Sequence, residues 1–189
     1  MAARITIAID DAAIDAALAR VAAAGLDARA LFDDIGASMV LQTQERFLRE
    51  KDPQYRFWKR HAKSTKRRRG PNAPVLRDRN LLFRSLTHEA SRTYARWGTN
   101  KKYAAIHQFG GTIERQVSRR IVTTSRRKDG RVLFAKKNTK VKSRVDRLVQ
   151  VGAHRIVIPA RPYLGINDAD RAVIAEKVEA YLKAAAEGK

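Results

Sequence analysis

The positive charge of this 189-residue chain is concentrated in its middle. Residues 51–161 contain 31 of the 40 Lys and Arg residues but only 6 of the 19 Asp and Glu residues. The two flanks together contain 9 basic and 13 acidic side chains. A segment with this charge density repels itself unless anions or acidic partners lie close to it. We therefore expect the middle to contact nucleic acid or an acidic protein surface; a merely solvated basic surface is the alternative.

The remaining composition predicts one soluble domain. With 44% hydrophobic residues the chain can build a core, and it has no cysteine, which fits a reducing compartment. We expect no signal peptide and no transmembrane span, because long apolar runs are absent. The predicted organisation is a single domain over residues 1–189. A basic loop at about 59–74 and a basic β-rich excursion at about 112–158 are its insertions.

Hydrophobic periodicity predicts helices in both flanks. Residues 4–9 alternate in period two and favour a strand, and Asp10-Asp11 then cap a helix that ends at Gly25. A second helix is expected from Asp27 to about Glu50, with Pro53 beyond its end. A last helix is expected after a cap at Asn167 or Asp168. Its predicted apolar face consists of Ile174, Val178, Tyr181, Leu182 and Ala185.

Gly36 falls on the apolar face of the second predicted helix. Glycine inside a helix costs about 1 kcal/mol relative to alanine. Either another backbone approaches closely at this position, which would offset the cost, or the glycine is simply tolerated. The sequence leaves both open.

Residues 54–74 combine aromatic side chains with a run of cations, Lys66-Arg67-Arg68-Arg69, that is followed by Gly70-Pro71. We expect a loop or arm here. Aromatic rings beside cations suit nucleic acid, where rings stack on bases and cations neutralise phosphates. We favour the other interpretation for Tyr55, Phe57 and Trp58, namely that they anchor the end of the preceding helix in the core.

The segment that follows predicts a turn and a short meander. Leu76, Leu82 and Leu86 are expected to be buried, with Asn80 at a turn. Two strands are expected at 85–91 and 93–97, and a short helix that starts at Tyr103 and stops at Gly110-Gly111.

Residues 112–158 have a β-like pattern. Strands are expected at 116–124 and 131–135, joined by a turn at 128–130. A closing hairpin is expected from 148–151 and 155–158 around Gly152-Ala153.

The fold class is therefore α+β: an antiparallel or mixed sheet packed on two or three helices, with an extended basic hairpin or arm and a C-terminal helix. Candidate polyanion or partner contacts are Lys66, Arg67, Arg68, Arg69, Arg126, Arg127, Lys128, Lys136, Lys137, Lys140 and Lys142.

No motif for catalysis or metal binding is recognisable. The four histidines lack metal-ligand spacing, and Gly110-Gly111 follows a predicted helix, so it is not a phosphate-binding loop. Asp78, Glu89 and Glu114 are too few and too scattered to favour a two-metal nuclease. His107 is expected to be a structural, hydrogen-bonding residue rather than a base. We predict a protein that is not an enzyme and needs no cofactor or metal.

Two stretches carry a family resemblance. Tyr103-Ala-Ala-Ile-His-Gln-Phe-Gly110 and, much later, Ile158-Pro-Ala-Arg-Pro-Tyr-Leu-Gly165 resemble the virion morphogenesis (tail completion) family of Mu-type tailed bacteriophages. Arg79-Asn80 stands where the family has Thr-Gly, and Asn tolerates the left-handed conformation that glycine would supply. The motif residues are Trp58, Leu76, Leu82, Tyr103, His107, Gln108, Phe109, Gly110, Pro159, Arg161, Pro162, Tyr163 and Leu164.

The resemblance implies a structural role in the virion. Such proteins are similar to neck and tail-terminator subunits, which assemble as rings at the head-proximal end of the tail. It implies a homo-oligomeric ring, expected to be a hexamer, assembled in the host cytoplasm. Its partners would be the tail tube or sheath and the head-completion proteins, with genome DNA passing through the lumen. The alternative is a stand-alone basic nucleic-acid-binding protein.

Overall fold

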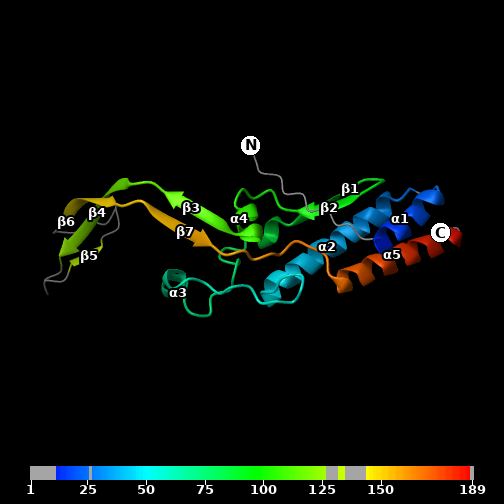
Figure 1. The fold of residues 1–189 in the computed structure, drawn as a ribbon, viewed down its shortest axis with the longest axis horizontal. Coiled ribbons are helices and arrows are strands. Elements are labelled where there is room, and N and C mark those ends of the chain that lie inside the picture. Colours follow the sequence, from blue (N-terminus) through cyan, green and yellow to red (C-terminus); the bar gives the residue numbers. More distant parts are fainter. Residues whose placement is uncertain (1–11, 26, 127–131, 135–143, 188–189) are drawn as a thin grey trace. The chain divides into compact units, whose positions relative to one another are not determined.

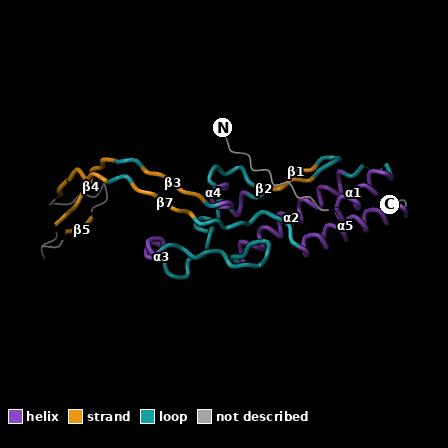
Figure 2. Tube along the Cα trace, viewed as in Figure 1, coloured by secondary structure: helices purple, strands orange, loops and turns teal. Residues whose placement is uncertain are grey.

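The computed structural model describes residues 12–25, 27–126, 132–134 and 144–187. Contacts divide the chain into two compact units. The first, which we call the helical unit, consists of Met1–Gly111 and Pro159–Lys189; the second, the β unit, is Thr112–Ile158. The predicted strand at 4–9 and the predicted turn at 128–130 lie outside the described residues. The predicted α+β class is confirmed (Figure 2).

Three long helices form one end of the helical unit: α1 (Ala12–Ala23), α2 (Arg29–Arg49) and α5 (Asp168–Ala186). Both α1 and α2 pack against α5 (Figure 1). Apolar side chains from all three helices meet in a first core cluster. Its buried members are Val21, Ala28, Leu31, Phe32, Ile35, Met39, Ile174 and Val178.

The ends of the helices follow local rules. The carboxylate of Asp27 accepts a hydrogen bond from the main-chain N–H of Arg29 (3.2 Å), and Glu50 ends α2 in the left-handed region, with φ 55°. Asn167 begins α5 through a capping box with Asp170, in which each side chain accepts the other residue's main-chain N–H. The predicted bounds of these two helices are confirmed.

The antiparallel hairpin of β1 (Thr87–Ala90) and β2 (Ala95–Gly98) packs on α2. A Cβ added at Gly36 would lie 2.7 Å from Cδ2 of His88 on β1. Gly36 therefore permits a close approach, but the neighbour is a side chain, so neither of the two alternatives, a close backbone or a merely tolerated glycine, describes it fully. The α2 glycine leaves room for the His88 ring.

A second core cluster lies where the C-terminal end of α2 meets the loops. It is centred on Phe47, whose ring centroid is 5.4 Å from that of Trp58 and 5.1 Å from that of Tyr163. Leu82 and Leu86 are buried in this cluster, whereas Leu76 is only partly buried against it. The other buried members are Val75 and Ala104.

The basic segment after α2 differs from its prediction in two ways. Residues Lys63–Arg69 form a short helix, α3, where a loop or arm was expected. Trp58 is buried as expected, but Tyr55 and Phe57 are 54% and 76% exposed, so the prediction that they anchor the core was wrong. Phe57 forms an isolated β-bridge with Lys51, whose ammonium lies 4.6 Å from the centroid of the Phe57 ring, so this ring contacts a cation outside the cluster.

The β unit contains two small sheets. Strand β3 (Gly111–Arg115) pairs with β7 (His154–Ile158), and the other sheet has the order β5-β4-β6. Its strands are β4 (Ser118–Arg126), β5 (Val132–Phe134) and β6 (Arg144–Val151). Both partners of β4 are antiparallel to it.

The predicted hairpin around Gly152-Ala153 was wrong. Strand β6 pairs with β4 along its full length, from Ser118↔Val151 to Ser125↔Arg144, and β7 pairs with β3. Gly152 and Ala153 therefore connect two different sheets. The chain crosses at Gly152-Ala153 from the edge strand of one sheet to a strand whose partner is β3, so β6 and β7 do not form a hairpin. Within the described residues, no helix is long and apolar enough to cross a membrane.

Candidate functional site

The two motif stretches meet inside the helical unit. Helix α4 (Ala104–Phe109) carries the first stretch, and the extended segment Pro159–Gly165 carries the second. The main-chain N–H of Arg161 donates to the main-chain carbonyl of His107 at 2.8 Å, which ties the two together. We call the polar contacts around this segment the motif centre.

Gln108 is the main link between the two stretches. Its Oε1 accepts hydrogen bonds from the main-chain N–H groups of Tyr163 (2.9 Å) and Leu164 (3.0 Å). Its Nε2 donates to the carbonyl of Leu164 at 2.9 Å. One buried amide thus satisfies three main-chain groups of an extended segment that has no strand partner there.

Arg161 and Trp58 attach the same segment to the loop after α2. The Nε of Arg161 donates to the carbonyl of Lys59 at 2.8 Å, and its Nη2 reaches the carbonyl of Arg60 at 3.4 Å. The indole N–H of Trp58 donates to the carbonyl of Pro162 at 2.8 Å. Burial lowers the pKa of Arg161, and its bonding groups are directed at main-chain oxygens.

A buried ion pair joins α2 to α5. Nη2 of Arg46 donates to Oδ2 of Asp170, and Nη1 donates to the carbonyls of Tyr163 (3.2 Å) and Gly165 (2.8 Å). Burial lowers the pKa of Arg46, and the charge of Asp170 opposes that shift. The Oδ1 atom of Asp170 has no hydrogen-bond partner among the described residues. A guanidinium on the buried face of α2 thereby holds the end of the motif segment.

Tyr163 is the apolar anchor of the motif centre. Its side chain is fully buried, and burial raises its pKa to about 12. Its hydroxyl donates to the carbonyl of Ala104 at 3.4 Å. Two residues later, Gly165 has φ +150°, and a Cβ added there would lie 2.8 Å from Cγ of Pro53. A side chain at position 165 would push this segment away from the loop after α2.

Glu50 plays a similar part in the neighbouring loop. Its Oε1 accepts from the main-chain N–H of Val75 at 2.6 Å, and its Oε2 accepts from Nη1 of Arg60 at 2.5 Å.

Sequence reasoning did not select Arg46, Glu50 or Asp170. For Arg46 a signal existed, because it continues the buried stripe of α2 through Met39 and Thr43 at helical spacing.

His107 lies at the edge of the motif centre with a half-buried side chain. Its ring is 5.9 Å from that of Tyr103, and its Nδ1 has no partner among the described residues. Burial, with a smaller contribution from the charge of Arg161, lowers the pKa of His107. The carbonyl of His107, rather than its ring, makes the structural hydrogen bond.

The other motif residues occupy varied environments. Tyr103 and Phe109 are 41% and 60% exposed, whereas Leu82 is buried. Gly110 adopts φ 73° at the end of α4. Asn80 adopts φ 55° at its turn, as expected at a position where the family motif has glycine. The half-buried members are Leu76, Pro159, Pro162 and Leu164.

The candidate polyanion contacts fall into two groups. On α3, Lys66, Arg67 and Arg68 are exposed, whereas Arg69 is held by Asp78 (3.1 Å) and by the carbonyl of Arg77 (3.3 Å). Arg126 ends β4. The others lie outside the described residues: Arg127, Lys128, Lys136, Lys137, Lys140 and Lys142.

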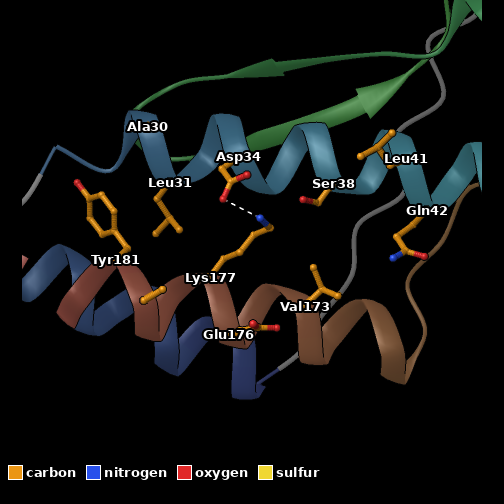
Figure 3. A pocket seen from close by; sticks show the side chains of 11 residues that line it. Ala30, Leu31, Asp34, Ser38, Leu41, Gln42, Val173, Glu176, Lys177 and Tyr181 are labelled. Atoms are coloured by element: carbon orange, nitrogen blue, oxygen red, sulfur yellow. Dashed lines mark hydrogen bonds and ion pairs between the residues drawn. The ribbon is translucent and has the colours of Figure 1, made fainter. Parts of the chain in front are cut away.

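An open groove of about 550 Å³ runs between α2 and α5 (Figure 3). Leu31, Val173 and Tyr181 give it an apolar floor, and Lys177 bridges it to Asp34 at 2.7 Å.

Among the described residues, no group of three His, Asp or Glu side chains is placed to hold a metal ion. The polar groups of the motif centre are bonded mainly to the chain itself, so the arrangement shapes the fold.

The comparisons with known proteins identify the family. No curated protein and no solved structure matches the chain. The model of the phage virion morphogenesis family matches residues 9–183. Because this match spans most of the chain and includes both motif stretches, the protein belongs to the phage virion morphogenesis family.

Proposed function

We propose that this protein is a structural subunit that completes the phage tail and forms, as an oligomeric ring, the interface between tail and head. Family membership supports a part in building the virion. The motif centre supports a structural role, since Gln108, Arg161 and Trp58 bond to main-chain groups of the same subunit. The proposal adds the position in the particle and the ring.

One observation carries the proposal. Among those residues of the β unit, Thr112–Ile158, for which the structure describes the burial, none is buried. Two- and three-stranded sheets are marginal in water unless a hydrophobic face is covered. Large side chains nevertheless lie exposed there, among them Ile121 (69%) and Leu148 (68%). A subunit that keeps such sheets uncovered is suited to an assembly in which neighbouring proteins cover them.

The charge distribution supports protein partners around a DNA passage. The β unit has 14 Lys and Arg residues against 3 Asp and Glu residues. Dense cations that all faced passing DNA would bind phosphates and resist its movement. Under this proposal at least some basic side chains contact the tail tube, sheath or head-completion proteins.

The proposal is tested by deleting the gene for this protein from the phage genome. We expect tails of uncontrolled length that fail to join heads, visible by electron microscopy, and recovery when the full chain is supplied in trans. Normal tails joined to DNA-filled heads in the deletion would contradict the proposal.

A second candidate function is nucleic-acid binding by the isolated chain. The exposed side chains of Lys66, Arg67 and Arg68 on α3 favour it. It predicts tight binding of duplex DNA by the monomer, with affinity falling steeply as salt rises. Weak binding by a preassembled oligomer would count against it.

A further inference from the structure

The sheet β5-β4-β6 has one face on which apolar and basic side chains alternate. Because side chains alternate across a strand, Arg120 and Val122 of β4 share a face with Val145, Arg147 and Val149 of β6. The register pairs Arg120 with Val149 and Val122 with Arg147. We call this the Val/Arg face.

The Val/Arg face has no cover within the described residues. Val145 is 47% exposed and Val149 is 38% exposed, and Phe134, opposite Thr124 on the same face, is 86% exposed. Arg120 and Arg147 have no ion-pair partner among the described residues. A partner for this face must therefore cover valines and also supply carboxylates.

The groove between α2 and α5 offers both. Its floor is apolar, and at one end Leu41 is 66% exposed (Figure 3). Asp34 and Glu176 line it; Asp34 is paired with Lys177, whereas Glu176 has no ion-pair partner among the described residues and is the carboxylate open to a partner. Along α2 the same surface continues through Glu45 to Leu48, which is 51% exposed, at helical spacing from Asp34 and Leu41.

We propose that the Val/Arg face of one subunit docks in the α2–α5 groove of a second copy of this chain. The valines would cover Leu41 and Val173, and the arginines would lie near Asp34 and Glu176. The two surfaces differ, so the contact is head-to-tail, and such a contact forms a ring when its rotation closes and an open filament when it does not. In requiring that closure, the inference rests on the proposed function.

A second copy fits this face better than DNA does. Phosphates would neutralise Arg120 and Arg147 but would leave the valines between them in water. Covering apolar surface contributes about 25 cal/mol per Å². A helical groove with carboxylates at its rim satisfies both kinds of side chain, whereas a nucleic acid backbone satisfies one.

Cross-linking tests the contact directly. The chain contains no cysteine, so single-cysteine variants react at one place only. Full-length Val149→Cys and Leu41→Cys proteins, one carrying a size tag, are mixed and treated with a short bismaleimide. We expect a covalent mixed dimer. The matched control is Ile121→Cys, on the opposite face of the same sheet, which should give little product with Leu41→Cys.

Charge reversal provides the second readout. Arg120→Glu with Arg147→Glu should weaken self-association about tenfold or more, measured by light scattering across a concentration series. Adding Glu176→Arg should restore part of it. Arg119→Glu changes the neighbouring residue on the other face and should have little effect, which also controls for folding.

The outcomes separate this inference from the proposed ring. An oligomer with no Leu41–Val149 product, or with equal product from Ile121→Cys, would overturn the interface and leave the ring standing. A monomer at every concentration that gives no product would overturn the interface and count against a ring in solution. A third outcome has two parts: the unchanged protein does not self-associate, and the variant with Arg120→Glu and Arg147→Glu loses DNA binding. That outcome would show that the Val/Arg face binds nucleic acid instead.

Discussion

At the scale of single residues, the fold depends on a few side chains that bond to main-chain groups. Gln108 is the clearest case, because its amide serves both N–H and C=O groups of the Pro159–Gly165 segment. In most folds a strand partner or a turn would supply these bonds. Here the loss of one side chain would leave several buried groups without partners, each at a cost of about 1–3 kcal/mol.

Gln108→Leu keeps the approximate size of the side chain and removes its three hydrogen bonds. We expect the free energy of unfolding to fall by about 2–4 kcal/mol, measured by urea denaturation. The control is Gln116→Leu, which changes an exposed glutamine and should have an effect within about 0.5 kcal/mol. Equal effects of the two substitutions would contradict the role assigned to Gln108.

Asp170→Ala should be among the most destabilising single changes. It leaves the buried guanidinium of Arg46 without its carboxylate, which costs about 3–5 kcal/mol. Glu179→Ala removes an exposed carboxylate that pairs with Arg20 and should cost less than about 1 kcal/mol. Adding Arg46→Met to Asp170→Ala should recover part of the lost stability. If it recovers none, the loss of the capping box contributes more than the unpaired guanidinium.

His107 should make stability depend on pH. Its pKa is lowered in the folded chain, so the unfolded chain binds more protons as the pH falls below about 6.5. The stability that depends on a neutral His107 ring is therefore present at pH 7.5 and is lost as the pH falls towards 5.5. We expect His107→Gln to flatten the fall in the urea midpoint over this range; an unchanged fall would assign it to other groups.

Several residue-level features could be predicted from the sequence. Trp58 was recognisable because an aromatic residue just after a helix can anchor its end in the core, and Asn80 because it replaces a glycine at a turn. Tyr163 was selected only through the family resemblance. Arg46 could be placed on the buried stripe of α2, but its pairing with Asp170 could not be predicted, because the two residues lie 124 positions apart in the sequence. Tyr55 and Phe57 were misjudged because their apolar character says nothing about the local turn, in which Tyr55 adopts φ 60° and Phe57 pairs with Lys51.

At the scale of elements, periodicity predicted the helices well and strand pairing poorly. The bounds of α2 and α5 follow from caps and apolar faces close in sequence. The pairing of β6 depends on β4, whose paired residues lie from 19 (Ser125↔Arg144) to 33 (Ser118↔Val151) positions earlier in the sequence. The short Gly152-Ala153 connection gave no sign that β6 and β7 belong to different sheets. Proximity in sequence favours a hairpin, whereas the longer ladder with β4 is the one formed.

Gly36→Ala tests how α2 meets the β1–β2 hairpin. Helix propensity alone predicts stabilisation by about 1 kcal/mol. Because the new Cβ would lie 2.7 Å from the His88 ring, we expect destabilisation by about 1–3 kcal/mol instead. In a His88→Ala background the same change should become neutral or stabilising, and a loss of the same size there would contradict the steric explanation.

Helix α3 tests whether its exposed cations serve assembly. Arg69 is held by Asp78 and should be left in place, so the informative variant changes Lys66, Arg67 and Arg68 to Gln. We expect reduced head–tail joining with unchanged stability. Changing the exposed Lys102 to Gln is the control. Full joining by the triple variant would remove α3 from the proposed interface.

At the scale of the whole molecule, the helical unit is well packed and the β unit is not. The helical unit has two core clusters and the motif centre, whereas no residue of the β unit whose burial is described is buried. For a member of a phage morphogenesis family, this contrast favours a subunit that is complete only in an assembly. The ring and the head-to-tail contact are our proposals for that assembly.

The mass of the full-length protein in solution is the most direct test of the proposed ring. Light scattering at low and high salt, with and without duplex DNA, measures the oligomeric state and DNA binding together. The account predicts a closed oligomer of fixed size that persists at high salt and gains no mass from DNA. A monomer that binds DNA at low salt and releases it at high salt would contradict the account.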